Sequence, residues 1–451
     1  MMKKCCWLFL VLTFVLSCRE DASWRQAEAI VAGIEVPAFP DAEFRITDYG
    51  AVPDALTDAL PSIRQALRLC SDAGGGHVVI PSGKWFCKGP VHLLSHVDLH
   101  FEDGAELVFS TDPADYLPCV LTRWEGTEVF NYSPLIYAWG VHHVAITGKG
   151  VLNGQGKLGF EAWKALQKAD QRELRRMGRE QVPVHERVFG EGHYLRPAMM
   201  DLVFCHSVLI EDVKIVDGTF WSFHLVGCSD ATVRRVSVDC TNLNSDGVDP
   251  ESCRNVLIED CCFHTGDDCI ALKSGRDQDG WRLGQPTENV VIRRCTFNTD
   301  SNGICIGSEV SGGIRNVFVS DCHIVRSKQG LYFKSNQDRG AYMERVYVRD
   351  IQVDTVLANL IKFEPAYKNE GSQYYPTAMR HFSIRGVRAR HAGECGIYLA
   401  GFPDLPVEDV YIGDLVLEDT PEPVKLSHYR DLTLDRVVIN GTMVTAPFDC
   451  H

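Results

Sequence analysis

The sequence predicts an all-β protein that folds as a single right-handed parallel β-helix, with an N-terminal capping helix and a helical insertion. The first observation is a short phrase of β-branched residues that recurs through the second half of the chain. Its copies start roughly 24 to 34 residues apart, a period typical of solenoids. The second observation is that no long helical pattern separates successive copies, which excludes leucine-rich and βα repeats. The strong copies begin at Ser207, Ala231, Asn255, Asn289 and Asn316, and the weaker ones at Arg345, Phe382, Val410 and Leu432.

Chain length does not require a second domain. A solenoid grows by adding coils, so the region 44–451 is expected to form one parallel β-helix catalytic domain. Early coils are indicated by the alternating stretch from Val97 to Phe101 and its continuation from Ala105 to Phe109. The Asn or Asp that precedes several strands suits a turn, because its side chain tolerates the left-handed backbone conformation.

Three stretches depart from the coil pattern. The stretch from Pro61 to Cys70 has one apolar face and is expected to cap the open end of the solenoid. The stretch from Phe160 to Arg179 is helix-like and densely charged, so it is either a solvated helix or the wall of a cleft. The insert from Ser274 to Glu288 is either a surface loop or a source of charge and sugar stacking, through Arg276 and Trp281.

The first residues resemble an export signal. Residues 1–18 combine a basic start with an apolar run that ends at Cys18. This pattern resembles a bacterial lipobox, in which Cys18 would receive the lipid. The alternative is an ordinary signal peptide with a chance Cys. Residues 19–43 are expected to be an N-terminal linker. Its Arg19-Glu20-Asp21 resembles the export tags of Bacteroidetes lipoproteins. We therefore expect an outer-membrane lipoprotein, at the cell surface or facing the periplasm, whose only membrane contact is its lipid anchor.

Charge and cysteine content limit the kinds of partner and cofactor that we expect. The net charge of −15 argues against nucleic acid, which needs a basic footprint, but local cations can still attract an anionic sugar. The eighteen Cys lack the compact, even spacing of a disulfide framework, so most are expected to be buried thiols. No spacing among the Cys and the sixteen His indicates a zinc site, and we expect neither a metal nor another cofactor.

Two acidic clusters carry the candidate chemistry. Asp246 and Asp249 lie in one cluster, and Asp267 and Asp268 follow about one coil later. Coil corners often use Asp, so each residue alone would indicate a turn. Stacked coils would bring the carboxylates together, where mutual repulsion favours one protonated acid beside ionised neighbours. Such pairs are the working groups of glycoside hydrolysis.

The motifs around these residues resemble those of glycoside hydrolase family 28, the polygalacturonases and related pectin hydrolases. The family phrase Asn-Thr-Asp-Gly matches Asn244-Ser245-Asp246-Gly247, and its Gly-Asp-Asp phrase matches Gly266-Asp267-Asp268. The resemblance implies that Asp267 is the general acid, whereas Asp246 and Asp268 position and deprotonate the attacking water, with inversion. Inversion needs roughly 6.5 to 9.5 Å between acid and base, so we expect a diagonal pair with water between its members.

Two family phrases are altered. Asp300-Ser301-Asn302-Gly303 replaces Gly-His-Gly, and Tyr332-Phe333-Lys334 replaces Arg-Ile-Lys. Lys334 can still pair with a uronate carboxylate, and Tyr332 offers stacking and one hydroxyl. His224, one coil before Asp246, is either a contact or a packed histidine. The candidate substrate-binding residues are Lys334, Tyr332, Asn244, Arg276, Ser301, Asn302 and His224.

The resemblance implies an inverting glycoside hydrolase that cleaves α-linked galacturonic acid from pectic polysaccharide or oligosaccharides, and the long insertions suggest exo-action. Two alternatives remain open. One is a pectate-lyase-like enzyme that uses Ca²⁺ for β-elimination, and the other is a non-catalytic β-helix that binds polysaccharide. In each case we expect a monomer.

Overall fold

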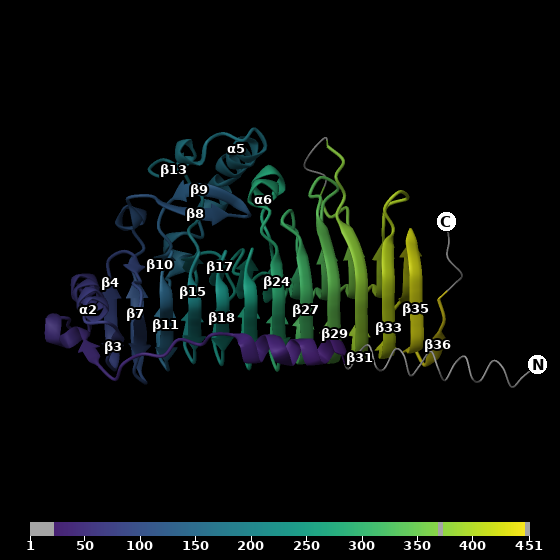
Figure 1. The fold of residues 1–451 in the computed structure, drawn as a ribbon, viewed down its shortest axis with the longest axis horizontal. Coiled ribbons are helices and arrows are strands. Elements are labelled where there is room, and N and C mark those ends of the chain that lie inside the picture. Colours follow the sequence, from purple (N-terminus) through teal and green to yellow (C-terminus); the bar gives the residue numbers. More distant parts are fainter. Residues whose placement is uncertain (1–21, 369–372, 447–451) are drawn as a thin grey trace, which may run out of the picture.

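The computed structural model describes residues 22–368 and 373–446 of the chain. Cys18 and the expected signal peptide lie outside the described residues. The coils stack along one axis with parallel strands, which confirms the right-handed parallel β-helix (Figure 1). No helix in the described part of the chain is both long enough and apolar enough to cross a membrane.

Each coil contributes strands to three ladders. The first ladder contains β1 (Glu43–Arg45), β3 (Gly76–Ile80), β6 (Val97–Phe101), β11 (His142–Gly148), β15 (His206–Glu211), β18 (Ser229–Arg234), β21 (Arg254–Glu259), β24 (Thr287–Arg293), β27 (Ile314–Ser327), β29 (Tyr342–Val356), β31 (Ala378–Ala392), β33 (Val407–Asp419) and β35 (Tyr429–Ile439). The second contains β2 (Asp54–Asp58), β4 (Gly83–Cys87), β7 (Ala105–Phe109), β12 (Val151–Asn153), β16 (Lys214–Val216), β19 (Ser237–Cys240), β22 (Cys262–Thr265) and β25 (Thr296–Thr299), and it merges with the first at β27. The third contains β5 (Val91–His92), β10 (Ile136–Trp139), β14 (Met200–Val203), β17 (Phe223–Val226), β20 (Val248–Glu251), β23 (Ile270–Leu272), β26 (Asn302–Ile306), β28 (Gln329–Lys334), β30 (Asn359–Glu364), β32 (Cys395–Ala400) and β34 (Glu422–Ser427). At the C-terminal end, β36 (Thr442–Val444) pairs antiparallel with β35.

The repeated phrase sets the register of the first ladder. Asn255, Asn289 and Asn316 start their phrases with positive φ, as expected for a left-handed turn position. Their amides also bond from coil to coil: Asn316 Nδ2 donates to Asn289 Oδ1 (2.9 Å), and Asn289 Nδ2 donates to Asn255 Oδ1 (3.0 Å). The β-branched residues that follow fill the core. The repeat therefore encodes both the turn and the stacking.

The cysteines behave as small core residues. All those that the structure describes are free thiols, and most are buried. Several recur at the same place in successive coils, as in the column Cys261, Cys295 and Cys322. The expectation of buried thiols is confirmed for the described part of the chain.

Apart from the helix at residues 22–33, the helices and irregular segments lie at one end of the coils and above them. Helix α2 (Leu60–Asp72) buries Ile63, Leu67 and Cys70 against the first coils, which confirms the capping helix. The expected helix from Phe160 to Arg179 is divided into α4 (Trp163–Leu166) and α5 (Lys168–Arg179). The remaining short elements are α3 (Gly156–Gly159), α6 (Asp277–Leu283), η1 (Ile46–Tyr49), η2 (Pro113–Tyr116), η3 (Val184–Glu186), and a small sheet of β8 (Val120–Trp124), β9 (Thr127–Asn131) and β13 (Val188–Phe189).

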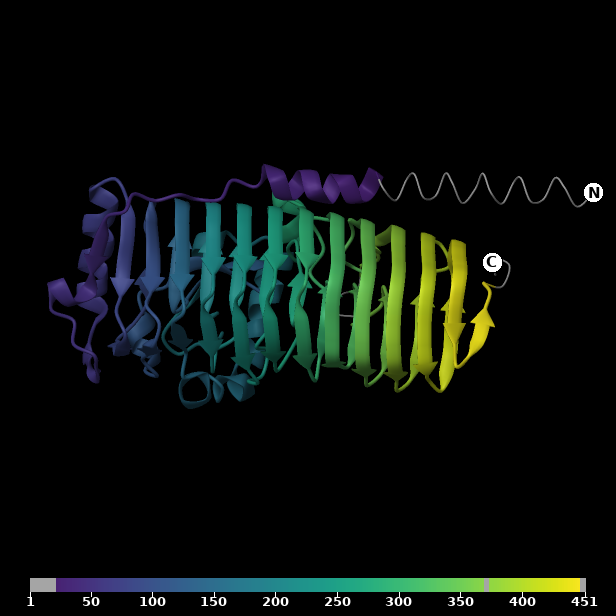
Figure 2. The same ribbon diagram turned by 90° about the horizontal axis from the view of Figure 1, so that it is seen from below.

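The expected N-terminal linker, 19–43, is more structured than its composition suggested. Residues 22–33 form a helix, and the chain then runs extended along the first ladder (Figure 2). We call residues 22–42 the N-terminal strap. Trp24 packs edge-on against Phe318, with 5.8 Å between ring centroids, and Ala27 joins the same apolar cluster. The N-terminal strap thus buries outward-facing apolar side chains on β21, β24 and β27. The sequence of the linker alone does not show that it packs on these strands.

Candidate active site

The candidate catalytic residues lie at the turns that lead into β20 and β23, on two successive coils, and their supporting residues Ser301 and Asn302 lie at the start of β26 on the next coil. The backbone N–H of Gly247 donates to the carbonyl of Asp268 (2.9 Å), and the N–H of Cys269 donates to that of Asn302 (2.9 Å). The ladder therefore places Asp246 beside Asp268, and Asp267 one residue earlier. All three aspartates line the same cleft. Strands about 4.8 Å apart bring carboxylates from two coils to one substrate.

Glycines beside the catalytic aspartates permit this close stacking. A Cβ on Gly247 would lie 2.3 Å from the carbonyl oxygen of Cys269, and one on Gly266 would lie 2.1 Å from that of Asn242. Both contacts are with backbone atoms, which cannot rotate away. The glycines of the two motifs are thus required by the approach of neighbouring coils.

Asp267 is held by two neutral donors. Asn244 Nδ2 lies 3.0 Å from one of its carboxyl oxygens, and Ser301 Oγ lies 2.8 Å from the other. Burial raises the pKa of Asp267, and the charge of Asp268 raises it further. Asp267 is half-buried and lines the cleft, so a proton on it can reach a substrate.

Asp268 has the opposite electrostatic environment. Lys334 Nζ donates to one of its oxygens at 2.9 Å, and Ser301 Oγ lies 3.0 Å from the other. Burial alone would raise the pKa of Asp268, but the charges of Lys334 and Lys273 hold it down to about 2. Adjacent residues thus form a proton-holding carboxyl and an ionised carboxylate, as expected for an acid and a base.

Asp246 forms a second carboxyl pair with Asp249. Burial raises the pKa of Asp246 well above its usual range and raises that of Asp249 to about 7, so the pair holds a proton near neutral pH. Lys273 Nζ lies 3.9 Å from Asp246 and 3.5 Å from Asp249. Asp246 Oδ1 accepts no hydrogen bond from an N–H or hydroxyl group of the described residues, so it can accept one from water.

The cleft has a volume of about 150 Å³ and a strongly polar lining. It contains the three candidate catalytic residues together with cations and aromatic rings from several elements. The lining residues are Glu125, Arg175, Trp221, Asn244, Asp246, Asp267, Asp268, Lys273, Arg276, Ser308, Glu309, Lys334, Tyr367 and Lys368. Of the candidate substrate-binding residues, Asn244, Arg276 and Lys334 are therefore in the cleft.

The other candidates lie behind its surface. Ser301 and Asn302 are not in the lining but bond the carboxylates, Asn302 through its Nδ2 to Asp268. Tyr332 is 4% exposed and lies under Tyr367, and its hydroxyl donates to Glu364, so its expected stacking face is covered.

Two further expectations need correction. His224 is 1% exposed, with Nδ1 2.7 Å from Asp201 and Nε2 3.1 Å from Glu251; although burial lowers its pKa, the two carboxylates raise it to about 10. It is a buried, ion-paired residue. Trp281 donates to the carbonyl of Arg339 (2.8 Å) and lies outside the cleft lining, so it does not provide the expected sugar platform.

Several lining residues were not predicted from the sequence. Lys273 directly follows β23, and Glu309 lies shortly after the end of β26, so their positions beside the motif-bearing strands were a usable signal. Glu125 lies in the turn between β8 and β9, and Arg175 lies on α5; no repeat or motif marks either residue. Glu125 accepts from Arg175 (2.6 Å), and its carbonyl accepts from Arg276 Nε (2.9 Å), so the two inserts meet at the cleft.

A wall over the N-terminal side of the cleft is formed by the small sheet, α5 and α6; we call it the insertion wall. The small sheet, α5 and α6 stand together above the coils (Figure 1). Arg187 pairs with Asp279 of α6 at 2.5 Å, both fully buried, and Arg282 of α6 pairs with Glu128 of β9. Of the two interpretations of the charged helix, the cleft wall is the one that fits, because its Arg175 lines the cleft.

Comparisons with known proteins agree with this geometry. The family model of glycosyl hydrolases family 28 matches residues 122–429. A probable polygalacturonase of Vitis vinifera is 30% identical over 69% of this chain, and another of Arabidopsis thaliana is 25% identical over 69%. The chain spans 60% and 58% of the length of these two relatives. The crystal structure of an exopolygalacturonase from Thermotoga maritima has a TM-score of 0.90 and 35% identity, covering 94% of this chain and 97% of that one.

The matched region contains the stacked aspartates, their supporting residues and most of the insertion wall. The chain belongs to glycosyl hydrolases family 28.

Proposed function

We propose that the protein is an inverting glycoside hydrolase that releases galacturonic acid from pectic polysaccharide or oligosaccharides by exo-action. The observation that carries the proposal is the adjacent pair Asp267 and Asp268, which share a polar cleft but have pKa values shifted in opposite directions. The similarity to a solved exopolygalacturonase supports both the reaction and the exo mode.

The proposed roles follow from the contacts of each carboxyl group. Asp267 keeps its proton and donates it to the glycosidic oxygen. Asp268 is ionised through Lys334 and removes a proton from the attacking water, while Asp246 holds that water with its free oxygen. The acid and the base act on opposite faces of the sugar ring, as inversion requires. The diagonal arrangement of Asp267 and Asp246 across neighbouring coils stays a prediction.

The cations of the cleft favour an anionic sugar. Arg175, Arg276, Lys334 and Lys368 line it beside the acids, and Lys368 is exposed. Although the protein carries a negative net charge, these local cations would attract a galacturonate carboxylate that enters the cleft. Binding should therefore weaken as salt is added, because exposed charges are screened.

The wall favours cleavage at a chain end. Ion pairs that join α6 to the rest of the insertion wall hold the wall over the N-terminal side of the cleft, where an open groove would let a polymer pass through. We propose that the wall limits the number of sugars on that side. In that case polygalacturonate releases monomer or a short product from the first minutes, with a slow fall in viscosity.

The location is a separate proposal. We propose that the chain is lipidated at Cys18 and held at the outer membrane, which the basic and apolar start of the sequence supports. We also propose that it is a monomer. Mass spectrometry of the N-terminal peptide from exporting cells tests the lipidation, with Cys18→Ala as the control. An unmodified peptide would contradict lipidation. Light scattering of the purified protein tests the monomer.

The product assay separates the hydrolase from its alternatives. We expect saturated galacturonate in the presence of EDTA, and proton NMR of early products should show the inverted anomer. Unsaturated, ultraviolet-absorbing products that require Ca²⁺ would instead indicate a lyase.

A variant pair then tests catalysis by the aspartates. Asp267→Asn should lower kcat about 10² to 10⁴-fold because it removes the general acid. Asp300→Asn is the matched control: Asp300 is exposed, pairs with Arg326 at 2.9 Å, and should leave kcat unchanged. Equal turnover by wild type and Asp267→Asn would remove the catalytic assignment of Asp267, whereas no turnover of pectic substrates by the wild type would favour a binding protein.

A further inference from the structure

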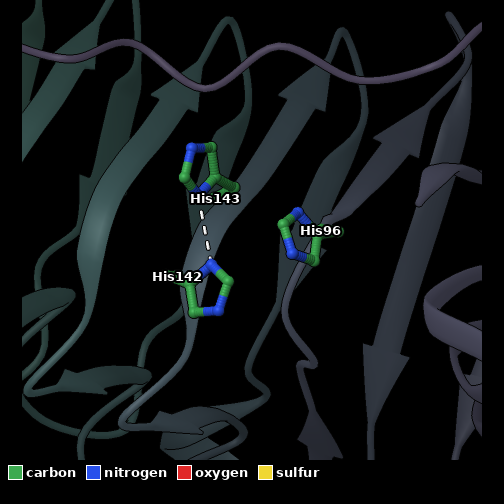
Figure 3. A group of neighbouring side chains, drawn as sticks. All are labelled: His96, His142 and His143. Atoms are coloured by element: carbon green, nitrogen blue, oxygen red, sulfur yellow. Dashed lines mark hydrogen bonds between the residues drawn. The ribbon is translucent and has the colours of Figure 1, made fainter. Parts of the chain in front are cut away.

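A second cluster of reactive side chains lies away from the cleft, where the first ladder begins its strands. His142 and His143 start β11, and His96 immediately precedes β6 on the neighbouring coil. The backbone N–H of His96 donates to the carbonyl of His142 (3.1 Å), so the ladder itself sets the two residues side by side. The three imidazoles face a common space beside the N-terminal strap (Figure 3).

The three rings are close enough to share one ion. One nitrogen from each lies within 4.8 Å of the others, and the Nδ1 atoms of His142 and His143 are 3.1 Å apart. Tetrahedral Zn²⁺ with Zn–N bonds of about 2.0 to 2.1 Å places its ligand nitrogens about 3.3 Å apart. His142 and His143 already have about that spacing. A nitrogen of the partly exposed His96 lies within 4.8 Å of both, so binding requires the His96 ring to move closer to them.

A carboxylate behind the cluster supplies an independent indication. Glu35 of the strap lies 2.9 Å from His143 Nε2, and its other oxygen lies 3.2 Å from Nε2 of His206. A Glu35 that accepts the proton of His143 Nε2 leaves the lone pair on Nδ1, the atom that faces His142. Metal-binding histidines typically donate their second ring N–H to a carboxylate in this way.

We propose that His96, His142 and His143 bind one Zn²⁺ or a similar late first-row divalent cation, and that Glu35 couples this site to the N-terminal strap. Imidazole nitrogen suits such ions, and three histidines leave a fourth position for water. The strap is also tied here by its backbone, because Ser207 Oγ donates to the carbonyl of Glu35 (3.1 Å). Binding of the ion therefore clamps the strap onto the coils.

The site joins residues from two coils and from the strap, so no local spacing in the sequence marks it. The strap that carries Glu35 runs along one side of the coils, whereas α5 and α6 stand above the coils (Figure 1). The cation is structural in this proposal and takes no part in hydrolysis.

Calorimetry with Zn²⁺ tests the binding site directly. The full chain, purified without a polyhistidine tag and stripped with EDTA, should bind one Zn²⁺ with a Kd below about 100 μM. His96→Ala and His142→Ala should each weaken binding at least about tenfold. His264→Ala is the matched control, because His264 is exposed and bonds Asp239 (3.0 Å) on the second ladder. A Kd above about 100 μM, or variants that bind like wild type, would overturn the site.

Hydrogen exchange tests the coupling to the strap. Zn²⁺ should slow the exchange of residues 34–42 in the wild type, but not in His142→Ala. Glu35→Ala should bind Zn²⁺ about 10-fold more weakly or worse, because it removes the group that orients His143. Tight binding with unchanged exchange in the strap would overturn the clamp.

Discussion

Replacement of Lys334 by methionine removes the charge that keeps Asp268 ionised. Lys334 Nζ lies 2.9 Å from Asp268, and their side chains are only 9% and 2% exposed, so water screens the pair weakly. At an effective dielectric constant of about 20, the attraction at this distance is about 6 kcal/mol, or about four pKa units. Lys273 remains nearby and water can enter the new space, so we expect a smaller shift of about two units or more.

The sign of the effect follows from the present pKa of Asp268. A pKa held at about 2 means that the carboxylate stabilises the fold at pH values above its unfolded pKa, and that this stabilisation is lost as the pH falls through about 2. Without Lys334, burial dominates and Asp268 takes up a proton at higher pH. The acid limb of the kcat/KM profile should therefore move toward neutral pH. The free energy of unfolding at pH 7 should fall by about 3 to 5 kcal/mol, because a buried charge loses its partner.

The assay is a pH profile of kcat/KM on galacturonate oligosaccharides, with urea unfolding at pH 7. Lys368→Met is the matched control: Lys368 lines the same cleft but is exposed, and its Nζ lies over the Tyr367 ring (4.7 Å). It should change substrate binding without moving the acid limb. An acid limb in Lys334→Met within about half a pH unit of wild type would refute the role given to this ion pair.

Three further predictions concern the cleft and the strap. Ser301→Ala removes a hydrogen bond that lowers the pKa of Asp267, so the basic limb of kcat/KM should move to higher pH; an unmoved limb would contradict Asp267 as the acid. In the wild type, Asp249, with a pKa raised to about 7, stabilises the fold fully below its unfolded pKa and progressively less as the pH rises through about 7. Asp249→Asn should therefore gain stability relative to wild type between pH 4 and pH 7, by at most about 1.4 kcal/mol per pH unit in urea unfolding, and a constant difference would count against this pKa. Trp24→Ala should expose the strap to limited proteolysis while the coils stay intact, with exposed Arg25→Ala as the control; equal cleavage in both would show that Trp24 does not hold the strap.

The repeat determined most of the coil architecture from sequence alone. Each phrase combines a left-handed Asn or Asp with inward β-branched residues, so local turn preference and core burial both favour the same coil. The motifs around Asp246 and Asp267 could be located for a related reason: one coil separates them, and the ladder turns that sequence spacing into proximity. The capping helix was equally accessible, since its apolar face is local to α2.

Tertiary structure decided the features that depend on contacts between distant segments. The sequence could not show that His224 is enclosed by Asp201 and Glu251, or that Tyr367 covers Tyr332, because a residue type does not specify its burial. The pKa of Asp267 is raised by burial that only stacking creates, and that of Asp268 is lowered by Lys334, two coils away. Local patterns fix how each coil folds, whereas the charges that tune the site come together only when the coils and the insertions pack.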